Sequence, residues 1–141
     1  MAASRIMVAV SSPWASEKLF ATVHDLADRL AGSVVVTHVV RATEEDDSTD
    51  QARQRGEQTL AGLADRLQEA KVQAEGVLLF GDDVARAILN AARAHNITLI
   101  VLGLSGKGRV ARLLEGDVPQ QVMRQADVPV LMFPPDWSGA I

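Results

Sequence analysis

The chain has 141 residues and is 48% hydrophobic, which excludes a disordered protein and suits a single domain over residues 1–141 with one hydrophobic core. Its formal net charge of −4 argues against general nucleic-acid binding, and the lack of cysteine excludes disulfides and thiol catalysis. The sequence shows no targeting segment and no apolar run of the ~20 residues that span a bilayer. We therefore expect a soluble, cytoplasmic domain that does not bind membranes, with the soluble domain of a larger membrane protein as the alternative.

The first part of the chain alternates between strand and helix patterns. Residues 6–10 form a short apolar run that predicts a buried strand. Apolar residues then recur at helical spacing as far as Leu30, and Gly32 follows as a stop signal. Residues 34–40 contain a run of valines, and β-branched runs of this kind are typical of a strand that is covered on both faces.

An acidic segment separates the second strand from a second helix. Residues 41–50 hold the only charge run of the chain, and it lacks the histidines and regular spacing of a metal site, so it predicts a solvated loop. A helical pattern follows over residues 51–71. Gly56 and Gly62 weaken that pattern, because glycine costs about 1 kcal/mol relative to alanine inside a helix.

The same alternation continues after this helix. Residues 72–80 predict a third strand, and Asp82 or Asp83 provides the cap of the helix that follows it. Residues 98–102 predict a fourth strand, which leads into a glycine-bearing loop over residues 103–116.

A short helix and a last strand complete the chain. The helix directs Val118, Val122 and Ala126 inward, and the apolar residues 128–133 predict the strand. The order of elements is therefore βαβαβαβαβ, which predicts a Rossmann-like α/β sandwich of three layers with a five-stranded parallel sheet and helices on both faces. Ligands of such sheets bind beyond the carboxyl ends of the strands.

The loop after the fourth strand has the features of an anion site. Glycines allow the backbone to approach a ligand, and the helix that follows directs free N–H groups toward the loop. The three glycines are spaced as Gly103, two residues, Gly106, nine residues and Gly116, which is neither a Walker loop nor a dinucleotide fingerprint. The loop also carries cationic side chains, which are Lys107, Arg109 and Arg112.

This glycine spacing, together with the first strand and the segment 126–131, resembles the universal stress protein family over nearly the whole chain. The resemblance implies strand order 3-2-1-4-5 and a homodimer paired through the last strand, Val128 to Phe133. It also implies, for one branch of the family, a bound ATP or another adenine nucleotide, with Mg when bound. The nucleotide-binding residues that it implies are Ala9, Ser11, Val39, Leu102, Gly103, Gly106, Gly116, Asp117 and Val118.

Two positions depart from the ATP-binding pattern of the family. Ser11 stands where the family has an acidic residue, and Asp117 stands where it has Ser or Thr after the last loop glycine. A carboxylate beside phosphate oxygens repels them unless a metal or proton intervenes, so we expect weak or metal-dependent ATP binding. Asp117 also suits a helix N-cap, where its carboxylate accepts from a backbone N–H.

Other candidate residues have ordinary structural interpretations. Trp14, assigned to the loop after the first strand, either stacks on a base or covers the first helix, and His38 is best explained as a hydrogen-bonded structural histidine. Trp137 belongs to a tail that docks on a partner or frays. No catalytic or metal-binding residue is identified. The sequence favours a nucleotide-responsive regulatory module; a dimeric interaction module with a degenerate ATP site is the alternative, and a slow ATPase ranks last.

Overall fold

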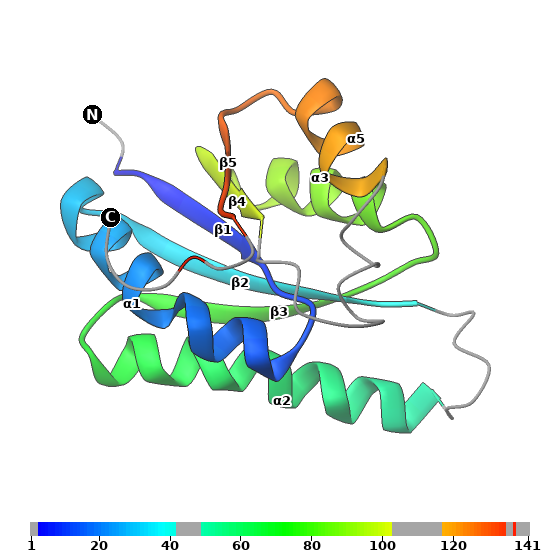
Figure 1. Ribbon diagram of the computed structural model, residues 1–141, viewed down its shortest axis with the longest axis horizontal. Coiled ribbons are helices and arrows are strands. Elements are labelled where there is room, and N and C mark those ends of the chain that lie inside the picture. The colour runs from blue at the N-terminus through cyan, green and yellow to red at the C-terminus, as the bar shows by residue number, and fades with distance from the viewer. Residues whose placement is uncertain (1–2, 42–48, 103–116, 135–136, 138–141) are drawn as a thin grey trace.

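The computed structural model describes residues 3–41, 49–102, 117–134 and 137, and it shows a parallel sheet between two layers of helices (Figure 1). The strands are β1 (Arg5–Ala9), β2 (Ser33–Val40), β3 (Ala74–Phe80), β4 (Leu99–Leu102) and β5 (Val130–Met132). The helices are α1 (Pro13–Leu30), α2 (Thr49–Glu69), α3 (Val84–Ala94) and α5 (Asp117–Gln125). The sheet has the order β3-β2-β1-β4-β5, which confirms the predicted fold class and strand order.

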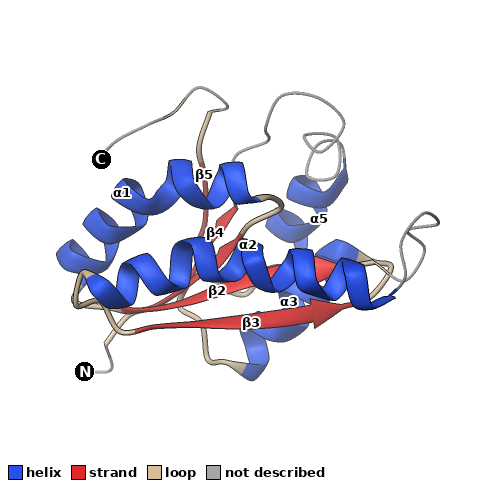
Figure 2. Ribbon diagram, turned by 90° about the horizontal axis from the view of Figure 1, so that it is seen from below, coloured by secondary structure: helices blue, strands red, loops and turns tan. Residues whose placement is uncertain are grey.

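Each face of the sheet is covered by its own pair of helices. Helices α1 and α2 lie on one face, and α3 and α5 lie on the other (Figures 1 and 2). Because side chains alternate along a strand, Ile6 and Val8 pack toward the first pair, whereas Met7 and Ala9 pack toward the second. All four are buried, which explains why the central strands are apolar without interruption.

The innermost positions confirm the predicted core. Val35 on β2 is 1% exposed, and Ile100 and Val101 on β4 are fully buried. None of the helices in the described part of the chain is long and apolar enough to cross a membrane.

Two helices begin at polar caps that the sequence displays. The Ser12 hydroxyl accepts a hydrogen bond from the N–H of Ala15 at 3.2 Å, and Pro13 occupies the first turn of α1. The carboxylate of Asp83, rather than that of Asp82, accepts from the N–H of Arg86 at 3.1 Å at the start of α3. Both caps fix where the chain leaves the carboxyl end of a strand.

The end of α1 shows why glycine follows it. The left-handed residue is Ala31, with a φ of 49°, and not Gly32. A Cβ on Gly32 would lie 2.7 Å from the carbonyl oxygen of Ser4, so a side chain there would meet rigid backbone. Gly32 is therefore required for close approach of two segments rather than for an unusual backbone angle.

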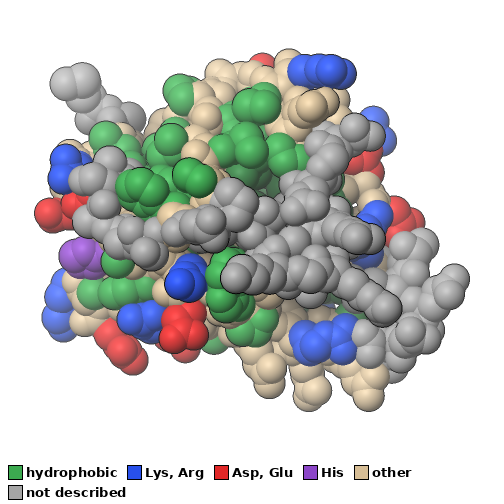
Figure 3. Space-filling view, in the orientation of Figure 1, with side chains coloured by type: hydrophobic (Ala, Val, Ile, Leu, Met, Phe, Trp, Pro, Cys, Tyr) green, Lys and Arg blue, Asp and Glu red, His purple; other side chains and the backbone are tan. Residues whose placement is uncertain are grey.

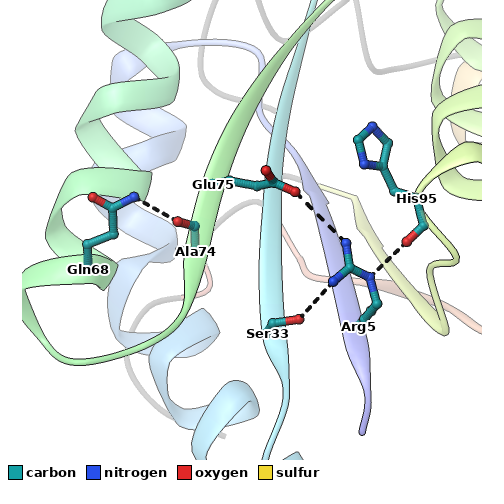
Figure 4. A network of polar contacts seen from close by, with 6 residues as sticks. All are labelled: Arg5, Ser33, Gln68, Ala74, Glu75 and His95. Carbon is teal, nitrogen blue, oxygen red and sulfur yellow. Dashed lines mark hydrogen bonds and ion pairs between the residues drawn. The ribbon is translucent and has the colours of Figure 1, made fainter. Parts of the chain in front are cut away.

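An arginine joins several elements at the amino-terminal edge of the sheet. The Nε of Arg5 donates to the carbonyl of His95 at 2.8 Å, and its Nη1 donates to the Ser33 hydroxyl at 3.4 Å (Figure 4). Its Nη2 lies 3.9 Å from the carboxylate of Glu75. A cation at the carbonyl that ends α3 also complements the helix dipole. This edge is thus held by polar contacts between elements of the chain.

Several element boundaries differ from the predicted ones. β3 begins at Ala74 rather than residue 72, because the N–H of Val72 donates to the carbonyl of Leu67 and closes the turn that follows α2. Helix α2 begins at Thr49, inside the segment predicted as loop, and ends at Glu69. β5 is limited to Val130–Met132, and Ala126 lies just beyond α5 but packs inward as predicted.

Trp137 docks on its own chain, so the prediction that it frays is wrong, whereas its docking on a partner stays a prediction. The indole Nε1 donates to the hydroxyl of Thr22 on α1 at 2.8 Å, and the ring lies 5.4 Å from that of Phe133. The indole thereby supplies a partner to a hydroxyl that is fully buried on α1.

Candidate ligand-binding site

A cavity of about 310 Å³ opens at the carboxyl ends of β1 and β2. The residues that directly follow β1 line one side, the end of β2 lines the floor, and the first half of α2 and the start of α3 complete the wall. This is the edge at which parallel sheets of this kind bind ligands, and the volume lies within the range of small-molecule sites.

The floor of the cavity is held by hydrogen bonds between β1 and β2. The N–H of Val10 donates to the carbonyl of Thr37 at 2.9 Å, and the Thr37 hydroxyl donates to the carbonyl of Val8 at 3.4 Å. The Nδ1 of His38 lies 2.8 Å from the carbonyl of Val10. A carbonyl can only accept, so this contact assigns the proton to Nδ1 and confirms that His38 is a hydrogen-bonded structural residue.

The helical wall approaches the floor closely. Gly56 of α2 faces the ring of His38, and a Cβ at this glycine would lie 3.0 Å from its Cδ2. The buried hydroxyl of Ser16 on α1 donates to the carbonyl of Thr59 on α2 at 2.7 Å. These contacts fix α1 and α2 at the edge of the cavity, so its shape is set before any ligand enters.

The charged side chains among the described residues that line the cavity are all cationic. Arg41 and Arg55 contribute two guanidinium groups, and the described lining residues include neither Asp nor Glu. The hydroxyl of Ser11 is buried, and no hydrogen-bond partner for it exists among the residues described. Apolar side chains from β1, β2 and α3 form much of the remaining surface, so the cavity can hold a flat apolar ring that carries oxygen acceptors.

The structure brings three of the nine predicted site residues together around this cavity. Ala9 ends β1, Ser11 follows it, and Val39 lies near the end of β2. Leu102 is buried at the end of β4 and pairs in register with Ala9, so it adjoins the same edge of the sheet without lining the cavity. Val118 is half-buried in the first turn of α5 and packs toward α3.

The structure does not describe the side chains of the remaining predicted residues. Gly103, Gly106 and Gly116 lie outside the described residues, as do the cationic side chains predicted for the same loop. Helix α5 begins at Asp117, whose side chain is also outside the described part, so its predicted cap and repulsion stay predictions.

Comparisons with known proteins agree with this architecture. The model of the "Universal stress protein family" matches residues 3–134. A universal stress family protein from Burkholderia pseudomallei shares 26% identity, with a TM-score of 0.74 over 94% of this chain and 96% of that chain. Because the family model matches most of the chain, it shows the family to which the chain belongs. The chain belongs to the universal stress protein family.

Two further relatives of this universal stress protein differ in how much of their own length it matches. The sensor protein KdpD of Mycobacterium tuberculosis is 27% identical over 131 residues, which cover 89% of this chain but only 14% of KdpD. A universal stress protein from Archaeoglobus fulgidus in complex with dAMP has the same fold, with 21% identity and a TM-score of 0.69 over 94% of this chain and 98% of that chain. This chain thus resembles both a protein of about its own length and a segment of a much longer one.

Sequence reasoning missed three polar residues that line the cavity of this universal stress protein, namely Arg41, Arg55 and Thr59. Arg41 follows β2 directly, and a cation at the carboxyl end of a strand was a usable signal. Arg55 and Thr59 lie inside α2, one turn apart, and reach the cavity only because α2 crosses over the end of β2.

Trp14 does not have the predicted position. It lies in the first turn of α1 rather than in a loop, is 39% exposed, and is not among the described lining residues. The ammonium of Lys18 lies 5.9 Å from its ring centroid. Trp14 therefore supplies exposed aromatic surface on the helix.

Proposed function

We propose that this universal stress protein is a regulatory module that binds an adenine nucleotide in the cavity at the ends of β1 and β2. The carrying observation is the cavity itself, which Ala9, Ser11 and Val39 line, and to which the family resemblance assigns the base and ribose. The dAMP complex of the Archaeoglobus relative supports the choice of an adenine nucleotide.

The chemistry of the walls supports this orientation. The aliphatic side chains of Val39, Val84 and Ile88 provide apolar contact for a purine ring, and the Ser11 hydroxyl is available to a ribose oxygen. The phosphates then extend past the end of β4, toward Gly103, Gly106, Gly116 and Asp117. Because Asp117 repels phosphate, ATP binds with Mg²⁺, which neutralises part of the charge.

The signal from the nucleotide passes through a homodimer in this proposal. β5 is an edge strand, paired with β4 on one side, and its Met132 side chain is 44% exposed. Met123 on α5 is 50% exposed, and hydrophobic side chains gather on the half of the surface that contains β5 and α5 (Figure 3). Edge strands with apolar side chains are usually covered in native proteins.

The same edge favours the second candidate function, a dimeric interaction module that no longer binds nucleotide. Met132→Glu would place a charge in the proposed interface, whereas Glu57→Gln on the exposed side of α2 serves as the control. Sedimentation at micromolar concentration should give a dimer for wild type and control and a monomer for Met132→Glu. A monomeric wild type would contradict both proposals of dimerisation.

Nucleotide binding is tested first on the protein as purified. Acid extraction followed by chromatography identifies any nucleotide that accompanies the chain, and calorimetric titration with AMP and with ATP, with and without magnesium, measures affinity. Phosphate release from ATP is followed in the same samples, where the slow-ATPase alternative predicts turnover. No extracted nucleotide and no heat of binding for AMP or ATP would leave the interaction module as the function.

A further inference from the structure

We propose that Arg41 is a ligand-binding residue that gives the cavity a site for an oxyanion, a phosphate or a carboxylate, at the β2 end. The inference names a binding group within the nucleotide cavity proposed above, and it rests on that cavity being a ligand site. It assigns the anion to a position other than the glycine loop after β4.

Among the described residues, not every donor of the Arg41 side chain has a hydrogen-bond partner. The side chain leaves the end of β2, lines the cavity, and its Nη2 reaches the carbonyl of Asp82 at 3.5 Å, the outer limit of a hydrogen bond. Its Nε is buried, and the part of the chain that the structure describes offers it no acceptor. A guanidinium has five N–H donors, and buried donors in native proteins are nearly always paired.

None of the described residues that line the cavity carries a carboxylate that could pair with Arg41. The described lining contains a second guanidinium, from Arg55, but no carboxylate. The buried Ser11 hydroxyl, which also lacks a partner among the described residues, offers a third donor to the same cavity. Donors of this kind match an oxyanion, because charge-assisted hydrogen bonds from arginine to phosphate or carboxylate are short and strong.

The position of Arg41 separates this site from the predicted phosphate loop. β1 lies between β2 and β4 in the sheet, so the carboxyl ends of β2 and β4 are two strand spacings apart, about 10 Å. An anion at Arg41 thus lies on the far side of the cavity from the loop that follows β4. The cavity accommodates either a nucleotide whose own phosphate points to Arg41, or a nucleotide with a second oxyanion beside it.

The test uses inorganic pyrophosphate and AMP as probes on the whole chain, by calorimetric titration. Arg41→Met keeps the long apolar stem and removes the donors, and Arg41→Lys keeps the charge but loses the Nε donor. Arg86→Met is the matched control, because Arg86 is exposed on α3 and is not among the described lining residues. We expect Arg41→Met to weaken pyrophosphate binding about tenfold to a hundredfold, with Arg41→Lys between it and wild type and the control unchanged.

Thermal unfolding without ligand distinguishes ligand binding from a structural role. Because its Nε has no partner within the described residues, Arg41→Met should keep or raise the melting temperature of the free protein. Lowered stability in Arg41→Met, or unchanged affinity for pyrophosphate, would overturn the inference.

The two sources of the oxyanion are separated by adding AMP to the pyrophosphate titration. Competition assigns Arg41 to the phosphate of the nucleotide, and simultaneous binding assigns it to a separate anion; both support Arg41 as the anion ligand. The nucleotide proposal fails separately, when wild type binds neither AMP nor ATP. Pyrophosphate binding that depends on Arg41 would then still support an oxyanion site.

Discussion

The two glycines inside α2 allow a matched test of how the wall of the cavity is built. Both lie in a helix interior, where alanine is favoured over glycine by about 1 kcal/mol, so Gly62→Ala and Gly56→Ala gain the same helix propensity. A Cβ on the exposed Gly62 would lie 3.6 Å from the Cβ of Ser16, an ordinary van der Waals contact. Gly62→Ala should therefore stabilise the protein by about 0.5–1 kcal/mol.

Gly56→Ala should behave differently because its surroundings are full. The new Cβ would lie 2.6 Å from the Leu78 Cδ1, 3.0 Å from the His38 Cδ2 and 3.3 Å from the Val40 Cγ2. The Leu78 methyl can rotate away, but the His38 ring is held by its hydrogen bond to Val10. Overpacking of this kind costs about 1–3 kcal/mol, so Gly56→Ala should be less stable than Gly62→Ala by about that amount.

Urea unfolding of the two variants and of wild type measures this difference directly, because the propensity gain cancels between the variants. In a Leu78→Ala background the penalty of Gly56→Ala should shrink, since the nearest atom has been removed. Equal stabilisation by both alanines would show that α2 moves freely away from β2, and it would refute the claim that the cavity is shaped before the ligand enters.

Three other predictions concern the core, the tail and the loop. Ile100→Ala should cost about 2–4 kcal/mol in urea unfolding, and a loss below about 1 kcal/mol would contradict the central position of β4. Trp137→Phe should cost about 1 kcal/mol, because it leaves the buried Thr22 hydroxyl without the indole donor; stability equal to wild type would refute docking of the tail. Asp117→Ser should strengthen ATP binding without magnesium about tenfold or more in calorimetry, and weaker binding would refute electrostatic repulsion by Asp117.

The fold was predictable because its strands are covered on both faces. Valine runs such as that of β2 require two apolar layers, and the alternation with helical patterns then leaves a parallel sheet as the solution. The boundaries were less predictable, because they depend on hydrogen bonds that composition does not reveal. The bond from the Val72 N–H to the Leu67 carbonyl, for example, closes the turn after α2 and delays the start of β3 to Ala74.

The sequence predicted only those residues of the candidate site that lie at or just after the end of a strand. Ala9 is the last residue of β1, and Ser11 follows shortly after it. A resemblance along the sequence was therefore enough to predict their position. Arg55 and Thr59 reach the same cavity from the middle of α2, and their position depends on the packing at Gly56. In the sequence, a glycine in a helical pattern indicates a less stable helix. In the structure, Gly56 permits the close approach of α2 to the sheet.

The polar groups of the cavity divide into two sets, and the division bears on how a ligand would act. The floor groups, on Val10, Thr37 and His38, are hydrogen-bonded within the chain, so they set the shape and gain little from a ligand. The Ser11 hydroxyl and the Arg41 Nε have no such bonds among the described residues, and each buried unpaired donor costs free energy in the empty protein. A ligand that supplies oxygen acceptors removes that cost, which an apolar ligand of the same size cannot do. Stabilisation by nucleotide should therefore exceed that by an apolar purine analogue at equal occupancy, and the difference should become smaller in Arg41→Met, where only the Ser11 donor remains.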